Sequence, residues 1–230
     1  MLSIVATPIG NLGDITLRAL ETLTTADAVV CEDTRVTGAL LHHLKIPKKE
    51  LVSLTSFTDD AKVEWILKRL EEGENIALVS DAGTPGISDP GYKLISRVRD
   101  RNFSVEVIPG PAAFLAALSA SGLPINQFFY IGFLPLKKGR KTLLQSLKDE
   151  ELTIVFYESV HRIEKTLTEL AAALIEQPTR PVVIARELTK LHEEVRRTTV
   201  ADLPEVAKSL TKKGEFVVVL GPVQDRGGSS

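Results

Sequence analysis

Residues 78–92 read LVSDAGTPGISDPGY and separate a short apolar run from an amphipathic segment. The apolar run, residues 76–79, predicts a buried parallel strand, and the acid-proline pair near the end of the stretch predicts a helix N-terminus. Three glycines between them allow positive φ and let a ligand approach the backbone closely. Ligands of open α/β sheets bind beyond the carboxyl ends of the strands. We therefore interpret this loop as part of a ligand site, with an ordinary strand-to-helix turn as the alternative.

Strand patterns alternate with helix patterns on both sides of this loop, which predicts an α/β fold with right-handed crossovers. The predicted strands are residues 2–6, 28–31, 51–54, 76–79 and 105–108 in the first half, and 128–132, 153–157, 182–185, 195–199 and 216–220 in the second. Helices are predicted between them, including residues 112–121, 138–147, 161–175 and 203–210.

We predict two α/β domains that meet at a turn with two prolines around one glycine. The first, residues 1–111, has a mostly parallel sheet flanked by helices. The second, residues 112–223, has a mixed sheet with helices, because a hairpin between Glu187 and Val195 reverses the chain. Residues 224–230 are polar and rich in glycine and serine, and we expect them to be disordered.

The composition excludes several classes of protein. The 230 residues include 43% hydrophobic ones, enough for a substantial core. The single cysteine, Cys31, excludes an intramolecular disulfide, and four scattered histidines without ligand-like spacing argue against a metal site. No apolar run approaches the ~18 residues of a membrane span, and no signal sequence precedes the first strand, so we expect a cytoplasmic protein.

The common nucleotide and hydrolase motifs are absent from the sequence: neither G-x-G-x-x-G, nor a P-loop, nor G-x-S-x-G occurs. Instead, polar or glycine-bearing segments directly follow the apolar runs. They are residues 7–10, 32–35, 80–83, 109–112, 132–135, 158–159 and 186–188. If the strands are parallel, many of these segments gather along one edge of each sheet.

Six motifs carry a resemblance to a known family, and they occur in one order along the chain. They are residues 6–14 (ATPIGNLGD), 31–35 (CEDTR), 80–85 (SDAGTP), 132–135 (GFLP), 156–163 (FYESVHRI) and 186–190 (RELTK). With them the chain resembles the ribosomal RNA small-subunit (cytidine-2′-O)-methyltransferases of the tetrapyrrole methylase superfamily, from residue 1 to about residue 221. Val160 departs from the family pattern, in which proline commonly follows the FYES motif.

The resemblance implies a tetrapyrrole-methylase-like fold of two α/β domains with S-adenosyl-L-methionine between them. It also implies a homodimer that methylates a cytidine ribose in 16S ribosomal RNA, so that small ribosomal subunit RNA would be the partner. Neither a metal nor a membrane is implied.

Residues of both domains are implied to hold the cofactor. They are Pro8, Ser80, Asp81, Ala82, Gly83, Thr84, Pro111, Ala112, Phe133, Leu134, Glu187, Leu188, Gly214 and Phe216. Backbone groups and an apolar slot suit both the adenine edge and the methionine tail. For Phe133, Leu134 and Phe216, plain core packing is the alternative.

Contact with RNA requires a local basic patch, because the formal net charge of the chain is −2. The candidates for phosphate contacts are Lys137, Lys138, Arg140, Lys141, Arg162 and Arg186. For the cluster after the GFLP motif, a solvated basic helix start is the alternative.

A ribose hydroxyl is a poor nucleophile until its proton leaves, so the site needs a general base or a cation that stabilises the alkoxide. Glu158 is the first candidate for a base, because it follows an apolar run in which burial could raise its pKa. Glu187 and Asp33 are further candidates for a base, and Arg35, Arg186 and Lys190 for a cation. The alternative for Glu158 is that it caps the next helix or pairs with Arg162.

Two other functions remain open. The same fold could methylate a tetrapyrrole or a protein side chain, but such an enzyme has no evident need for the basic cluster. A non-catalytic RNA-binding assembly factor would need that cluster but not the loop at residues 80–85. Binding of S-adenosylmethionine would therefore distinguish a methyltransferase from such a factor.

Overall fold

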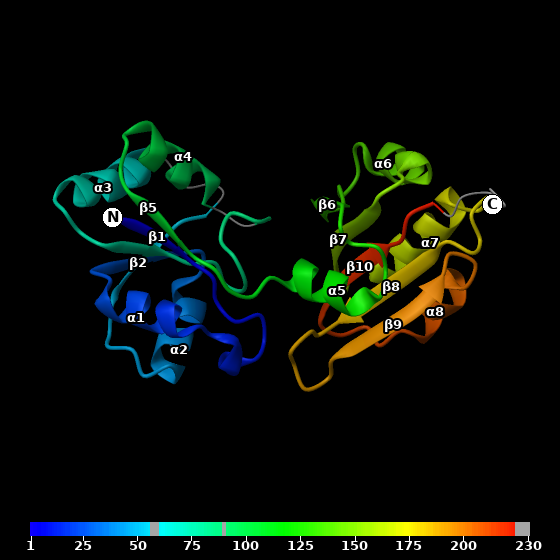
Figure 1. Ribbon diagram of the computed structural model, residues 1–230, viewed down its shortest axis with the longest axis horizontal. Coiled ribbons are helices and arrows are strands. Elements are labelled where there is room, and N and C mark those ends of the chain that lie inside the picture. Colours follow the sequence, from blue (N-terminus) through cyan, green and yellow to red (C-terminus); the bar gives the residue numbers. More distant parts are fainter. Residues whose placement is uncertain (56–59, 89–90, 224–230) are drawn as a thin grey trace. The chain divides into compact units, whose positions relative to one another are not determined.

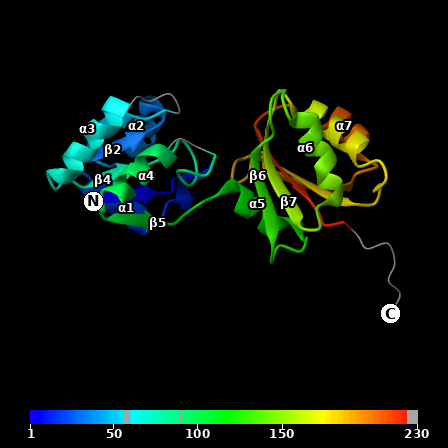
Figure 2. The ribbon, with the colours of Figure 1, turned by 90° about the horizontal axis from the view of Figure 1, so that it is seen from above.

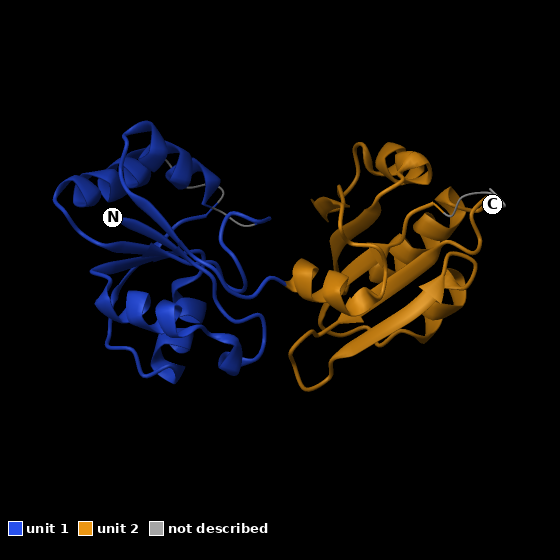
Figure 3. Cartoon of the chain, viewed as in Figure 1, with its two compact units in different colours: residues 1–112 blue, residues 113–230 orange. Residues whose placement is uncertain are grey.

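The computed structural model describes residues 1–55, 60–88 and 91–223. The chain divides into two compact units, Met1–Ala112 and Ala113–Ser230 (Figure 3). The helix N-terminus expected at Asp89 and Pro90 and the expected disordered tail lie outside the described residues. The expected division into domains of residues 1–111 and 112–223 stays a prediction.

The first unit contains a five-stranded sheet in which every pairing is parallel. In the order β3-β2-β4-β1-β5, its strands are β3 (Glu50–Ser53), β2 (Ala28–Cys31), β4 (Ile76–Leu78), β1 (Leu2–Val5) and β5 (Val105–Ile108). Its helices are α1 (Leu17–Thr25), α2 (Thr34–His43), α3 (Asp60–Glu71) and α4 (Tyr92–Asp100), with a 3₁₀ turn η1 (Leu12–Asp14) after β1. The predicted parallel sheet is confirmed.

Both faces of this sheet are covered by helices, which explains why the inner strands β2 and β4 are apolar throughout. Side chains alternate along a strand, so Val30 packs with α3 and α4, whereas its neighbours Val29 and Cys31 pack with α1 and α2. Figure 1 shows the two pairs of helices on opposite sides of the sheet. Right-handed crossovers produce this arrangement, because β1 and β2 lead to strands on one side and β3 and β4 to strands on the other.

The strand order changes direction between β1 and β4, which are neighbours in the sheet. The chain leaves β1 toward β2, past β4, and leaves β4 toward β5, past β1, so the two following connections lie on opposite faces of the sheet. Such a switch point is where open α/β sheets bind ligands.

The second unit contains a mixed sheet in the order β6-β7-β10-β8-β9. Its strands are β6 (Phe128–Phe133), β7 (Thr153–Ser159), β10 (Glu215–Leu220), β8 (Pro181–Arg186) and β9 (Glu194–Thr199). Only β6 and β7 are parallel, and β8 and β9 form the predicted hairpin. Its helices are α5 (Ala113–Ser121), α6 (Arg140–Ser146), α7 (Ile163–Ala173) and α8 (Leu203–Ser209), with a 3₁₀ turn η2 (Leu147–Asp149).

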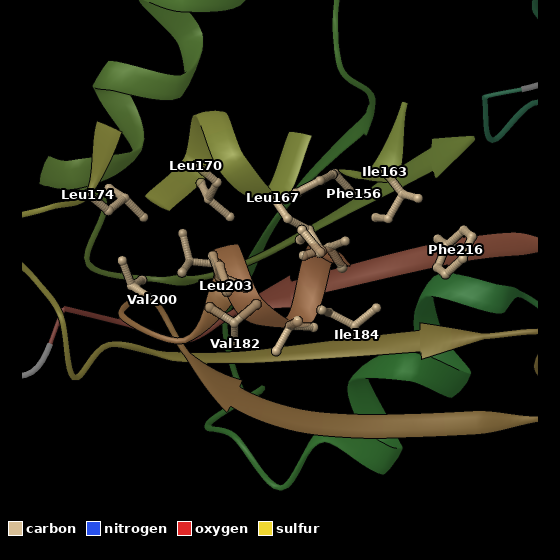
Figure 4. Packing of buried hydrophobic residues seen from close by; sticks show 14 of the residues in the cluster. Phe156, Ile163, Leu167, Leu170, Leu174, Val182, Ile184, Val200, Leu203 and Phe216 are labelled. Atoms are coloured by element: carbon tan, nitrogen blue, oxygen red, sulfur yellow. The ribbon is translucent and has the colours of Figure 1, made fainter. Parts of the chain in front are cut away.

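Helices α6, α7 and α8 cover one face of the mixed sheet, and α5 lies on the other (Figure 2). The larger core lies under α7 and α8, where Leu167 and Leu203 meet Phe156 and Ile184 of the strands (Figure 4). Helices α6 and α7 begin two residues later than predicted. Gly139, with a φ of +82°, precedes α6 and cannot belong to a right-handed helix in that conformation.

None of the helices in the described part of the chain is both long and apolar enough to cross a membrane.

Replacement of Leu167 by alanine should lower the free energy of unfolding by about 2 to 5 kcal/mol, because its side chain is fully buried on α7. The matched control is Leu191→Ala in the same unit, whose residue is 93% exposed and should change that free energy by less than about 0.5 kcal/mol. Denaturant unfolding of both variants measures the difference. Similar losses would contradict the assignment of the core.

Candidate functional site

Three loops meet at the carboxyl edge of the parallel sheet. Thr7, after β1, and Gly83, after β4, exchange two backbone hydrogen bonds of 2.9 and 3.1 Å. The hydroxyl of Thr84 donates to the carbonyl of Pro111, after β5, at 3.1 Å. Hydrogen bonds therefore join the loops that carry the predicted residues Pro8, Ser80–Thr84 and Pro111.

The polar side chains of the loop after β4 form hydrogen bonds with backbone groups of this loop and of the loop after β2. Ser80 is 2% exposed, and its hydroxyl lies 3.3 Å from the carbonyl oxygens of both Ala82 and Gly83. The carboxylate of Asp81 accepts the backbone N–H of Asp33 at 3.0 Å, which ties this loop to the one after β2. What the loop offers a ligand is therefore its backbone, with the exposed Ala82 at its surface.

The pKa values of the two acidic residues after β2 are shifted in opposite directions. Arg35 donates two hydrogen bonds to the carboxylate of Asp33 and lowers the pKa of Asp33 to about 2. Burial, followed by the nearby Asp81 and Asp33, raises the pKa of Glu32 instead. Asp33 is thus a weak base, while the Arg35 side chain remains charged and 89% exposed.

Glu32 was not among the predicted candidates for a base, although Asp33 beside it was. The sequence could have indicated a partly buried carboxylate here, since Glu32 directly follows the apolar run Ala28–Cys31. The proximity of Asp81, 49 positions away, is set by the sheet order and could not be inferred locally.

In the second unit, Glu187 and Lys190 form an ion pair at the turn between β8 and β9. One oxygen of the Glu187 carboxylate accepts the Lys190 ammonium at 3.0 Å and the backbone N–H of Glu215 at 3.1 Å. Lys190 also pairs with the Glu215 carboxylate at 2.8 Å. The predicted residues Glu187, Lys190 and Gly214 are thereby brought together, because Gly214 precedes Glu215.

These contacts fix the charges of the pair. The hydrogen bond from Lys190 lowers the pKa of Glu187. Burial disfavours the charged form of Lys190, but its bonds to Glu215 and Glu187 outweigh that effect and raise the pKa of Lys190. At neutral pH, Glu187 is a weak base and Lys190 is a stable cation.

The surroundings of Arg186 disfavour the predicted contact with RNA. Its residue is 8% exposed, and its guanidinium donates to the Glu194 carboxylate at 3.2 Å and to the carbonyl of Lys213 at 3.4 Å. Its donors hold β8 to the neighbouring segments and do not face solvent.

Glu158 is buried after the apolar run, as expected, but its carboxylate is paired within the protein. Its side chain is fully buried at the end of β7 and pairs with the Arg162 guanidinium at 2.8 Å, which confirms the ion pair named as the alternative. A carboxylate without solvent exposure and with its oxygens occupied is not placed to take a proton from a substrate. Arg162 in turn is occupied by this pair and is not a free phosphate ligand.

The basic cluster after β6 separates into two kinds of residue. Lys137, Lys138 and Lys141 are exposed, whereas Arg140 is 7% exposed and pairs with Glu169 at 2.7 Å. The phosphate contact stays a prediction for the three lysines. It is disfavoured for Arg140, whose donors bond to Glu169, Pro135 and Thr166 within the protein.

The three implied cofactor residues for which core packing was the alternative also differ in their exposure. Leu134 and Phe216 are 2% and 1% exposed within the core under α7, as the packing alternative predicted. Phe133 is 54% exposed, and its ring lies 5.4 Å from that of Tyr157. Leu188 is buried beside the turn that holds Glu187.

Residues 1–204 match the family described as Tetrapyrrole (Corrin/Porphyrin) Methylases, and the chain belongs to that family. Within it, the chain is similar to proteins named ribosomal RNA small subunit methyltransferase I. That of Escherichia coli O157:H7 is 48% identical over 222 residues, which cover 95% of this chain and 77% of the relative. That of Thermotoga maritima is 44% identical over 219 residues, which cover 95% and 97%.

Solved structures confirm the predicted fold. Cobalt precorrin-4 methyltransferase has a TM-score of 0.70 at 22% identity, over 96% of this chain and 94% of the other. Uroporphyrin-III C-methyltransferase from Thermus thermophilus, complexed with S-adenosyl homocysteine, has a TM-score of 0.66 at 20% identity, over 96% and 97%. The cofactor prediction is confirmed with the family: S-adenosylmethionine is its methyl donor.

Residues of each unit suit this cofactor. Gly83 has a φ of +84°, and a Cβ there would lie 3.4 Å from Ile9 and 3.6 Å from the carbonyl oxygen of Pro111, so the loop is closely packed at its backbone. Ala82 leaves that loop open to solvent on one side. In the second unit, the exposed ring of Phe133 offers an apolar face on which an adenine can stack.

Gly214→Ala should destabilise the protein more than Gly139→Ala. Both glycines have positive φ, +89° and +82°, so each substitution costs about 1 kcal/mol in backbone strain. A Cβ at residue 214 would also lie 2.3 Å from the Glu187 carboxylate, whereas nothing lies within 4 Å at residue 139. Loss of the Glu187 hydrogen bonds should add roughly 1 to 3 kcal/mol, measured by denaturant unfolding. Equal costs would show that Glu187 is not held as described.

Proposed function

We propose that this protein transfers a methyl group from S-adenosylmethionine to the 2′-hydroxyl of a cytidine ribose in 16S ribosomal RNA. The observation that carries the proposal is 44–48% identity, over nearly the whole chain, to proteins named for methylation of small-subunit ribosomal RNA. The nucleotide and the position of the methyl group come from the resemblance of the six motifs. A homodimer and a cytoplasmic location are parts of the same proposal.

We assign cofactor binding to both units. In the first, the backbone of Ser80–Thr84 and the neighbouring Pro8, Pro111 and Ala112 would hold the cofactor. In the second, Phe133 and the turn that carries Glu187, Leu188 and Gly214 would hold it. When bound, the cofactor supplies a methyl group on a positively charged sulfur, which makes that methyl intrinsically reactive.

The chain's own contribution to the chemistry is then positioning and charge. Glu158 is buried, and the pKa values of Asp33 and Glu187 are lowered, so none of the three predicted bases is well placed to remove the ribose proton. Lys190 and Arg35 keep their positive charges and can stabilise negative charge as it develops on the ribose oxygen. The proton can leave to water, and the residues around the two reactants mainly hold them in line.

Tetrapyrrole methylation is the second candidate, because the solved neighbours act on tetrapyrroles. Those neighbours share 19–25% of the sequence and support the fold, whereas the RNA-modifying relatives share 44–48%. The exposed lysines 137, 138 and 141 also favour a polyanion. A non-catalytic assembly factor is disfavoured because the cofactor loop is fully formed.

The decisive experiment measures methyl transfer from radiolabelled S-adenosylmethionine to small ribosomal subunits that lack the modification. Methylation of the 2′-hydroxyl protects the adjacent phosphodiester from alkaline cleavage, so one cytidine in 16S RNA should become resistant. Label on a base, or transfer to uroporphyrinogen but not to subunits, would overturn the proposal. Free 16S RNA as a parallel substrate shows whether the assembled subunit is required.

Replacement of Lys137, Lys138 and Lys141 together by alanine should weaken binding to small subunits and reduce its dependence on salt. If each lysine contacts a phosphate, the slope of log K against log salt should fall by roughly 2 to 3. Affinity for S-adenosylmethionine, measured by calorimetry, should be unchanged.

The matched control removes three exposed lysines elsewhere in the second unit, Lys148, Lys165 and Lys208. It changes the net charge by the same amount, so it separates local phosphate contacts from general electrostatic attraction. An identical salt slope for the two triple variants would show that Lys137, Lys138 and Lys141 are solvated and make no specific contact with phosphates.

A further inference from the structure

A buried charged cluster lies between the end of β7 and the segment that follows β6. The Glu158 cluster, as we call it, consists of Glu158, Arg140, Arg162 and Thr166. Side-chain exposures are 0% for Glu158, 8% for Arg140 and 22% for Arg162. Glu158 continues the inward-facing positions of Ile154 and Phe156, so the chain places a carboxylate where the pattern of β7 calls for an apolar side chain.

Each oxygen of this carboxylate has defined partners. One accepts the backbone N–H of Ser159 and the Arg162 guanidinium, both at 2.8 Å. The other accepts the Thr166 hydroxyl at 2.6 Å and lies 3.6 Å from the Arg140 guanidinium. Arg140 also donates to the Thr166 oxygen at 2.6 Å, so the hydroxyl links the two charges.

The two arginines reach from this carboxylate to consecutive backbone carbonyls. Arg162 donates to the carbonyl of Leu134 at 3.1 Å, and Arg140 donates to the carbonyl of Pro135 at 3.2 Å. Leu134 and Pro135 come directly after β6, where no ladder hydrogen bonds hold the chain. The cluster therefore restrains the backbone of Leu134 and Pro135, which the hydrogen bonds of the sheet no longer hold.

Stability alone is a poor explanation for such a cluster. Burying ions costs several kcal/mol each, and a well-packed apolar group of the same size is often as stable or more so. A planar guanidinium that bridges a carboxylate and a carbonyl gives directional restraint instead, which an apolar side chain cannot supply.

The restrained segment is flanked by the residues assigned to ligand contact. Phe133, whose ring is exposed, directly precedes Leu134, and the exposed Lys137 and Lys138 follow Pro135 by two and three residues. Arg140, although next to Lys141 in sequence, points the other way, into the cluster.

We propose that the Glu158 cluster is a positioning device for methyl transfer: it fixes the carbonyls of Leu134 and Pro135, and thereby holds Phe133 toward the cofactor and Lys137 and Lys138 toward RNA. This inference rests on the proposed function. Glu158, Arg140 and Arg162 are positioning residues in it, since they act through the segment and do not touch either substrate.

The test is Glu158→Gln, which keeps the side-chain shape and removes the charge. Amide hydrogen exchange should become faster in residues 131–141 and stay unchanged in the β8–β10 part of the sheet. The dissociation constant for S-adenosylmethionine should rise about tenfold, which corresponds to about 1.4 kcal/mol. The control is Glu164→Gln on α7, whose exposed ion pair with Lys212 should affect neither measurement.

Thr166→Val is the second variant, in case Glu158→Gln does not fold. It removes the hydroxyl that links Glu158 to Arg140 while it keeps the charges and the side-chain volume. Faster exchange confined to residues 131–141 supports the proposal.

Unchanged exchange in that segment, or faster exchange spread evenly over the second unit with unchanged cofactor affinity, overturns it in favour of a purely stabilising role. These measurements need no RNA. Binding of S-adenosylmethionine without methylation of subunits would therefore contradict the proposed function and leave the cluster's role to be judged separately.

Discussion

The two backbone hydrogen bonds between Thr7 and Gly83 are the contact on which the first unit's binding edge depends. They join the loops after β1 and β4, the neighbouring strands at which the sheet order changes direction. Divergent loops at such a switch point leave room for a ligand, and without a restraint they would also be free to move apart. The Thr84 bond to the Pro111 carbonyl extends the same restraint to β5. The edge is therefore held by hydrogen bonds within the protein, and restraint of this kind reduces the ordering cost of binding.

In the second unit, ion pairs restrain the segments that follow the strands. Its sheet is mixed, so the ends of its strands do not gather at one edge as they do in a parallel sheet. Ion pairs hold the segments that leave the strands: Glu187 with Lys190 at the β8–β9 turn, and Glu158 with its two arginines after β6. Both carboxylates were candidates for a base, and in both the structure shows partners that suit restraint better than proton transfer. Positioning is accordingly the main catalytic contribution that we assign to the chain.

The local patterns predicted the elements because apolar periodicity depends on near neighbours. The strands at residues 28–31 and 105–108, for example, appear with the predicted bounds. What the patterns could not supply was the direction of long side chains. Arg140 and Lys141 are adjacent in a basic run, yet only the fold decides that the guanidinium turns inward toward Glu158, 18 residues later. The low pKa of Asp33 could not be predicted from the sequence, although Arg35 is only two residues away. The shift depends on a hydrogen bond from Arg35, and that bond requires particular rotamers of both side chains. The cofactor itself came from motif resemblance and not from periodicity.

The arrangement of the Glu158 cluster also bears on how the sequence can vary. Loss of the carboxylate alone leaves Arg162 without its ion-pair partner and Arg140 with Glu169 alone, and loss of either arginine leaves a backbone carbonyl without its donor. Single replacements at residues 140, 158 and 162 are therefore each more harmful than their joint replacement by apolar groups would be for stability. In descendants of this chain the three positions should change together or not at all, so that their substitutions are statistically coupled, whereas Lys137, Lys138 and Lys141 beside them can drift one by one.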